Sequence, residues 1–73
     1  MPLITVKMIE GVFTTAKKKE MITKLTDALV SVEGEALRPY TLVLLEEVRS
    51  GDWSVGGKSL TTADVHAIAG KAA

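Results

Sequence analysis

The sequence predicts an α+β domain: a β-α-β unit followed by a short hairpin and a tail helix, covering residues 1–73 as one domain. Two apolar runs, at residues 3–9 and 40–48, have the length and composition of strands. Between them, apolar residues recur at helical spacing. Turn-forming residues then divide the last third of the chain into short pieces. A chain of 73 residues has the length of a single small domain.

The first strand and the helix have clear boundary signals. Residues Ile4, Val6 and Met8 form one apolar face of a strand that ends at Glu10 and Gly11. Thr14 or Thr15 is expected to cap the helix, because a threonine hydroxyl can accept a hydrogen bond from a free backbone N–H group. Gly34 is the expected end of this helix. The predicted buried stripe consists of Ile22, Leu25, Leu29 and Val32, widened by Met21 and Ala28.

The second half of the chain begins with an apolar strand. The run 42–45 is apolar on both faces, which is typical of a strand buried on both sides. Residues 53–55 form a short extended piece that Gly56 and Gly57 close with a turn. Thr61 and Asp64 form a capping box for a last helix that we expect to reach about Ala69.

The length and the second strand together predict an oligomer. A domain this small buries only roughly 60% of its unfolded surface, so it is only marginally stable by itself. The helix can cover one face of the second strand, and the chain has little else to cover the other. Because cysteine is absent, disulfides cannot compensate. We therefore expect a homo-oligomer.

Composition excludes several classes of protein. Nine basic and nine acidic residues give a formal charge of zero, which argues against a nucleic-acid-binding protein. The absence of cysteine and the single histidine, His66, argue against a metal site. No apolar run approaches the roughly 20 residues of a membrane span, and the N-terminus lacks the features of a signal peptide. We expect a cytoplasmic protein that neither spans a membrane nor holds a metal.

Pro2 is the residue with the most distinctive chemistry. Removal of Met1 would leave a free prolyl amine, a secondary nitrogen in a rigid ring. An α-amino group titrates near ~7.7–8.0, and modest desolvation keeps it largely neutral at pH 7. Such a group is suited to general base catalysis. Pro2 is therefore a candidate catalytic base.

Several features together resemble the 4-oxalocrotonate tautomerase family. They are Pro2 opening a strand, Glu10 and Gly11 at its end, one long helix, an apolar second strand, and the segment 51–57. The resemblance covers nearly the whole chain up to Gly57. It implies a tautomerase-superfamily β-α-β unit that assembles as a homohexamer, a trimer of dimers.

The resemblance also implies an activity and a site. The chain would be an isomerase, a cofactor-free keto–enol tautomerase, with Pro2 as the base that moves a proton on an enol or unsaturated keto acid. Trp53 falls where the family has an aromatic residue in the pocket, and Ile9 and Val55 would form its apolar wall. An apolar wall favours the neutral amine.

Two departures from the family pattern concern the substrate. The arginine that follows the Glu-Gly pair in the family is Val12 in this chain, and the arginine of the second strand is Leu42 or Tyr40, depending on the alignment. Arg38, at the entrance of the second strand, is the nearest replacement for binding an anionic substrate.

Two alternative functions remain open at this point. The same scaffold can support hydration or dehalogenation of unsaturated acids, but no carboxylate in the sequence clearly fits the role of activating water. The missing arginines also allow a non-catalytic chain, a partner subunit in a hetero-oligomeric assembly.

Overall fold

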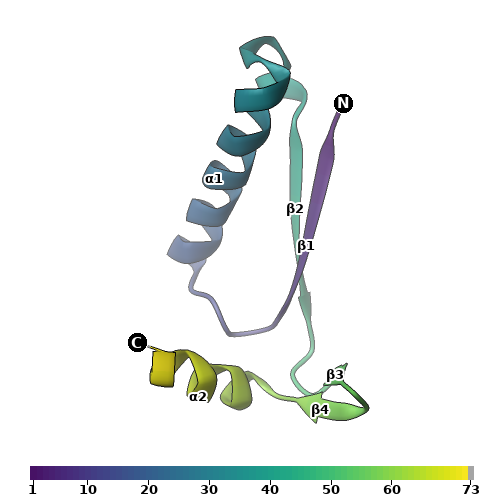
Figure 1. The fold of residues 1–73 in the computed structure, drawn as a ribbon, viewed down its shortest axis with the longest axis vertical. Coiled ribbons are helices and arrows are strands. Elements are labelled where there is room, and N and C mark those ends of the chain that lie inside the picture. The colour runs from purple at the N-terminus through teal and green to yellow at the C-terminus, as the bar shows by residue number, and fades with distance from the viewer. Residues whose placement is uncertain (73) are drawn as a thin grey trace.

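The computed structural model describes residues 1–72. Two long strands lie against one long helix, and a small hairpin and a second helix lie at one end of them (Figure 1). The β-α-β unit, the hairpin and the tail helix are confirmed. The elements in chain order are β1 (Leu3–Ile9), α1 (Thr15–Glu33), the 3-10 helix η1 (Glu35–Tyr40), β2 (Leu42–Val48), β3 (Trp53–Val55), β4 (Lys58–Leu60) and α2 (Thr62–Ala72).

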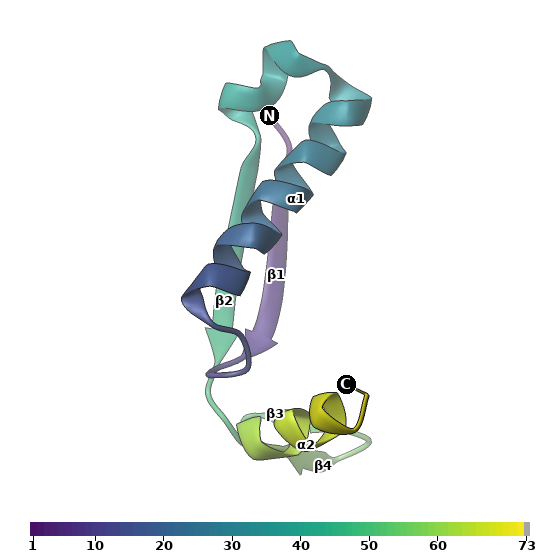
Figure 2. The same ribbon diagram turned by 90° about the vertical axis from the view of Figure 1, so that its left-hand side faces the viewer.

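The two long strands are parallel and in register. Pairing runs from Leu3 opposite Leu42 to Ile9 opposite Val48. Helix α1 crosses one face of this pair (Figure 2), as expected for the connection between two parallel strands. Side chains on this face are buried or half-buried; they are Ile4, Val6 and Met8 of β1 with Val43 and Leu45 of β2.

The opposite face of the strand pair is open in the single chain. Leu3, Leu42 and Leu44 are 55%, 45% and 49% exposed. At the far end of this face, Lys7 Nζ lies 3.9 Å from Glu46 Oε2. The second strand is therefore apolar on both faces but covered on only one, as the sequence indicates. No helix within residues 1–72 is long and apolar enough to cross a membrane.

The predicted ends of α1 are confirmed. Thr14 Oγ1 accepts a hydrogen bond of 3.1 Å from the Lys17 N–H, which is the expected N-cap. At the other end, Gly34 has φ of 102°, and its N–H donates to the Val30 carbonyl over 2.8 Å. A positive φ is readily adopted by glycine, so this residue ends the helix without strain.

The predicted buried stripe of α1 is wrong at three positions, because Ile22, Ala28 and Val32 are all exposed. Val32 is 88% exposed and Ile22 is 40% exposed, whereas Val30 is buried. After Gly34 the chain returns on the side of Val30 and Glu33, where the Thr41 hydroxyl donates to the Glu33 carboxylate. Val30 and Val32 are two residues apart and so point to nearly opposite sides of the helix, which leaves Val32 facing outward. Helical spacing alone does not reveal on which side the chain returns.

Two further boundaries differ from the prediction. Residues 35–40 form η1, so Tyr40 belongs to a helical turn, and β2 begins at Leu42. The last helix continues past Ala69 to Ala72. Gly70 does not end it, because one glycine inside a helix costs only about 1 kcal/mol relative to alanine.

Turn chemistry fixes the hairpin and the start of α2. Gly56 and Gly57 have φ of 60° and 84°, and positive φ at both central residues is typical of a tight two-residue hairpin turn. The predicted capping box is formed: the Thr61 N–H donates to Asp64 Oδ2, and the Asp64 N–H donates to Thr61 Oγ1.

The loop between β1 and α1 is held by a carboxylate of β2. Glu47 accepts hydrogen bonds from the Gly11 N–H (3.2 Å) and from Lys18 Nζ (3.0 Å). The Lys18 ammonium and the Gly11 N–H together lower the pKa of Glu47 below its ordinary value of 4.5. Glu47 therefore connects β2 both to the loop and to the first turn of α1.

A pair of valines on α1 tests the packing of this helix. Val30→Ala should lower the free energy of unfolding by roughly 1–3 kcal/mol, because it removes buried methyl groups from a site that is already packed. Val32→Ala should change it by less than about 0.5 kcal/mol, since that side chain is exposed. Urea denaturation of both variants at one protein concentration measures the difference. Equal effects of the two substitutions would contradict the described packing.

The carboxylate of Glu47 should contribute to acid sensitivity. A lowered pKa in the folded state adds stability that is complete above about pH 4.5 and is lost as the pH falls through the folded-state value. Glu47→Gln should therefore reduce the loss of stability between neutral pH and about pH 3. Lys18→Gln should reduce it less, because the Gly11 N–H still favours the charged form. Urea midpoints measured against pH provide the check, and superimposable wild-type and Glu47→Gln profiles would refute it.

Candidate active site

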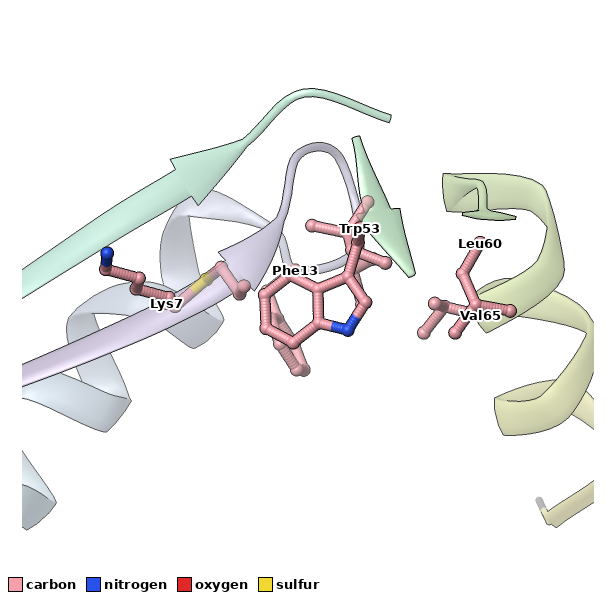
Figure 3. Close-up of a pocket in the computed structure, with 8 residues that line it drawn as sticks. Lys7, Phe13, Trp53, Leu60 and Val65 are labelled. Carbon is pink, nitrogen blue, oxygen red and sulfur yellow. The ribbon is translucent and has the colours of Figure 1, made fainter. Parts of the chain in front are cut away.

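A pocket of about 250 Å³ lies where the end of β1 meets the hairpin and α2. Figure 3 shows the Trp53 side chain in the middle of it, next to Phe13, with Leu60 and Val65 to one side and Lys7 to the other. Apart from Lys7, all the lining side chains are apolar. The lining residues are Lys7, Met8, Ile9, Val12, Phe13, Trp53, Leu60 and Val65.

Four separate segments of the chain build this pocket. The end of β1 contributes Met8 and Ile9, which are both only 6% exposed. The loop before α1 adds Val12 and Phe13, the hairpin adds Trp53 and Leu60, and α2 adds Val65. A Ser50 N–H bond to Glu10 Oε1 (3.1 Å) connects the loop to the turn that leads into the hairpin. The pocket therefore depends on the way the last third of the chain folds onto the end of β1.

Pro2 lies at the opposite end of β1. Its carbonyl accepts a hydrogen bond of 3.0 Å from the Leu42 N–H, so it stands where β2 begins. Seven residues at roughly 3.3 Å each place Pro2 about 23 Å from Ile9. In Figures 1 and 2 the N-terminus lies at one end of the molecule and the hairpin at the other. A single chain does not bring Pro2 and the Trp53 pocket together.

Arg38 lies at the Pro2 end, on η1, and its charge already has partners. Its Nε and Nη2 donate to the two carboxylate oxygens of Glu35 over 2.8 and 3.2 Å, and Nη1 donates to Asp27 Oδ1 over 2.8 Å. These bonds to Glu35 and Asp27 raise the pKa of Arg38. The Arg38 guanidinium in turn lowers the pKa of Glu35. A substrate carboxylate at Arg38 would have to compete with these two groups.

The predicted apolar wall is formed only in part. Ile9 and Trp53 lie together in the pocket. Val55 does not line it; its side chain is 62% exposed on the hairpin. The substrate-binding roles of all three residues, like that of Arg38, stay predictions.

Sequence reasoning missed six of the lining residues, Val12 among them, which it treated only as the position of an absent arginine. Lys7 could have been found, because strand alternation places it on the same face as Ile9, two residues further along. The Lys7 ammonium points away from the indole (Figure 3), so its aliphatic part is what lines the pocket. Val65 and Leu60 had no comparable signal, since their place depends on how α2 and the hairpin dock. The missed residues are Lys7, Met8, Val12, Phe13, Leu60 and Val65.

The described part of the chain offers no ready metal site. Among residues 1–72, no group of three His, Cys, Asp or Glu side chains is placed to hold a metal ion.

Comparison with known proteins identifies the family. A family model described as a tautomerase enzyme matches residues 2–63. A 2-hydroxymuconate tautomerase of Bacillus subtilis (strain 168) is 38% identical over 61 residues, which are 84% of this chain and 95% of that protein. A probable tautomerase of Dickeya dadantii (strain 3937) is 31% identical over 61 residues, 84% of this chain and 90% of the relative.

Solved structures agree with these relatives. A crystal structure of a 4-oxalocrotonate tautomerase homologue has a TM-score of 0.71 and 31% identity, covering 88% of this chain and 95% of that one. The crystal structure of YwhB, another homologue, has a TM-score of 0.70 and 33% identity, covering 86% and 97%. The fold, the family model and the sequence identity therefore agree, and the chain belongs to the tautomerase family of isomerases.

Proposed function

We propose that this chain is a cofactor-free keto–enol tautomerase in which the free amine of Pro2, exposed after removal of Met1, is the general base. Its substrate is a small enol or unsaturated keto acid, and its expected location is the cytoplasm. The observation that carries the proposal is the family match, which begins at residue 2 and so includes Pro2 as its first residue. The amine takes a proton from the enol hydroxyl or from carbon and returns one to carbon, so the reaction moves a proton and consumes nothing.

The site is proposed to form between copies of the chain. About 23 Å of β1 separate Pro2 from Ile9, so a site that contains both Pro2 and the Trp53 pocket would take them from two copies. The open face with Leu3, Leu42 and Leu44 supports assembly, because apolar side chains this exposed gain stability when a second copy covers them. We propose a homo-oligomer, with the hexamer as the expected form.

The apolar pocket suits a neutral amine. Low local dielectric disfavours the charged form of an amine, so the walls from Ile9, Val12 and Trp53 would keep the Pro2 nitrogen able to accept a proton. Excluding water from the same space also strengthens each polar contact that the substrate makes. The pocket would thus support the base without contributing a catalytic group.

Activity should require the free amine of Pro2. Protein that retains Met1, verified by intact mass, has an amide nitrogen at Pro2 and should lose nearly all ketonisation of phenylenolpyruvate. Pro2→Ala should keep a fraction of the activity, because its amine is primary and more flexible, and the acid limb of its kcat/KM profile against pH should move. Circular dichroism controls for folding. Full turnover by the Met1-retaining protein would overturn the mechanism.

Mixing two defective proteins tests whether the site is shared. The Met1-retaining protein keeps a normal Trp53 pocket, and Trp53→Ala keeps a normal Pro2. After unfolding and refolding together, random assembly should form about a quarter of the sites from the intact parts of both. Refolding each protein alone is the control, and light scattering reports the assembly size. If the mixture is no more active than the two proteins refolded separately, although its assemblies have normal size, a site shared between copies is refuted.

The missing family arginines should weaken discrimination between diacids and monoacids. A bidentate arginine–carboxylate pair is strong and geometrically specific, whereas Arg38 is bound by Asp27 and Glu35. We expect kcat/KM for 2-hydroxymuconate and for the monoacid 2-hydroxypenta-2,4-dienoate to differ by less than about 100-fold, or roughly 2.7 kcal/mol. Arg38→Ala and Lys7→Met, compared in both assays, show which cation contacts the substrate. A larger preference for the diacid would contradict this expectation.

A further inference from the structure

Helix α2 lies almost entirely beyond the part of the chain that matches the family. The match ends at residue 63, and α2 runs from Thr62 to Ala72. The helix nevertheless contributes Val65 to the Trp53 pocket. One wall of the pocket is thus built by a segment outside the family match.

Three hydrogen bonds hold the start of α2 against the pocket. The Thr62 N–H donates to Ser50 Oγ over 2.9 Å, and the Thr62 hydroxyl donates to the Glu10 carbonyl. One turn further on, His66 Nε2 lies 3.0 Å from the Gly11 carbonyl oxygen. The contacts of the Thr62 hydroxyl and His66 reach the loop that supplies Val12 and Phe13, so α2 and the loop hold each other in place.

Helical spacing then aims Val65 at the pocket. Positions 62, 65 and 66 are related by three and four residues and share one face of α2. Since Thr62 and His66 both contact the loop, Val65 between them must face the same way, and it lies beside Leu60 at the edge of the pocket (Figure 3). Ile68 lies outside the pocket lining and is 62% exposed.

We propose that Val65 is a specificity-determining residue that sets how large an apolar substituent the substrate can carry. This inference rests on the proposed function, which places the substrate's apolar end in the Trp53 pocket. The pocket has room for a small conjugated chain or a ring, and its base and walls are fixed by buried or hydrogen-bonded elements. The Val65 side chain is where the volume can change with least disturbance, since it stands at the edge rather than in the core.

Two enols of different size measure this effect. Phenylenolpyruvate and 2-hydroxypenta-2,4-dienoate are both monoacids, so charge recognition is matched and the apolar part differs. One methylene in an apolar pocket changes selectivity by roughly 10-fold or more. The selectivity ratio is kcat/KM for phenylenolpyruvate divided by kcat/KM for 2-hydroxypenta-2,4-dienoate. Val65→Ala should therefore raise this ratio by about 10-fold, and Val65→Phe should lower it by a similar factor. Ile68→Ala, the matched control on the same helix, should leave the ratio within about two-fold of wild type.

A binding measurement separates this inference from the proposed function. Trp53 is the only tryptophan, so its fluorescence reports the pocket when cinnamate, an aryl acid that cannot tautomerise, is titrated. Tighter cinnamate binding in Val65→Ala and weaker binding in Val65→Phe would support the role of Val65, whether or not the protein turns over either enol. Absence of turnover would refute only the proposed function. Turnover with an unchanged selectivity ratio and unchanged cinnamate affinity in a folded Val65→Ala protein would overturn the role of Val65. That variant decides the matter if Val65→Phe does not fold.

Discussion

The parallel, in-register pairing of β1 with β2 is the constraint on which the rest of the structure depends. Parallel strands start at the same end, so Pro2 and the chain entering β2 share one end of the molecule, and the pocket lies at the other. The molecule is 43 Å long. Pro2 and Arg38 lie towards one end, and the Trp53 pocket lies towards the other. This pairing leaves one sheet face to α1 and the other open, with Leu3, Leu42 and Leu44 exposed on it. That open face is the surface on which the proposed assembly would form.

The two ends of the molecule are built in different ways. At the Pro2 end, charges are paired: Arg38 holds Asp27 and Glu35 on the surface, where ion pairs add little to stability. At the pocket end, apolar side chains from four segments meet. The Glu10 and Glu47 carboxylates accept hydrogen bonds from backbone N–H groups there, and the Thr62 hydroxyl and the His66 ring contact backbone carbonyl oxygens. A proposed site that takes its base from the first end and its walls from the second would combine a free terminus with a rigid pocket.

Local signals explain what the sequence could predict. The cap at Thr14, the stop at Gly34, the glycine turn and the Thr61–Asp64 box all act within a few residues, and each is present in the structure. The errors arise where packing between distant segments determines which side chains are buried: Val30 is buried and Val32 is exposed, the reverse of the predicted stripe. In the site, Ile9 and Trp53 both line the pocket and Val55 does not, while the roles of all three towards a substrate stay predictions. Val65 joins the pocket through a docking that helical periodicity does not encode.

The attachment of α2 depends on few side chains of the loop that it contacts. Both carbonyl oxygens that it contacts in the loop belong to the backbone of Glu10 and Gly11, which every sequence supplies. Gly11 already has φ of 75°, and a Cβ there would lie 3.3 Å from the Thr62 methyl group. A glycine that the turn requires thus leaves the room that Thr62 occupies. The attachment of α2 to this loop therefore needs particular side chains only from α2, Thr62 and His66, together with the absence of a side chain at Gly11.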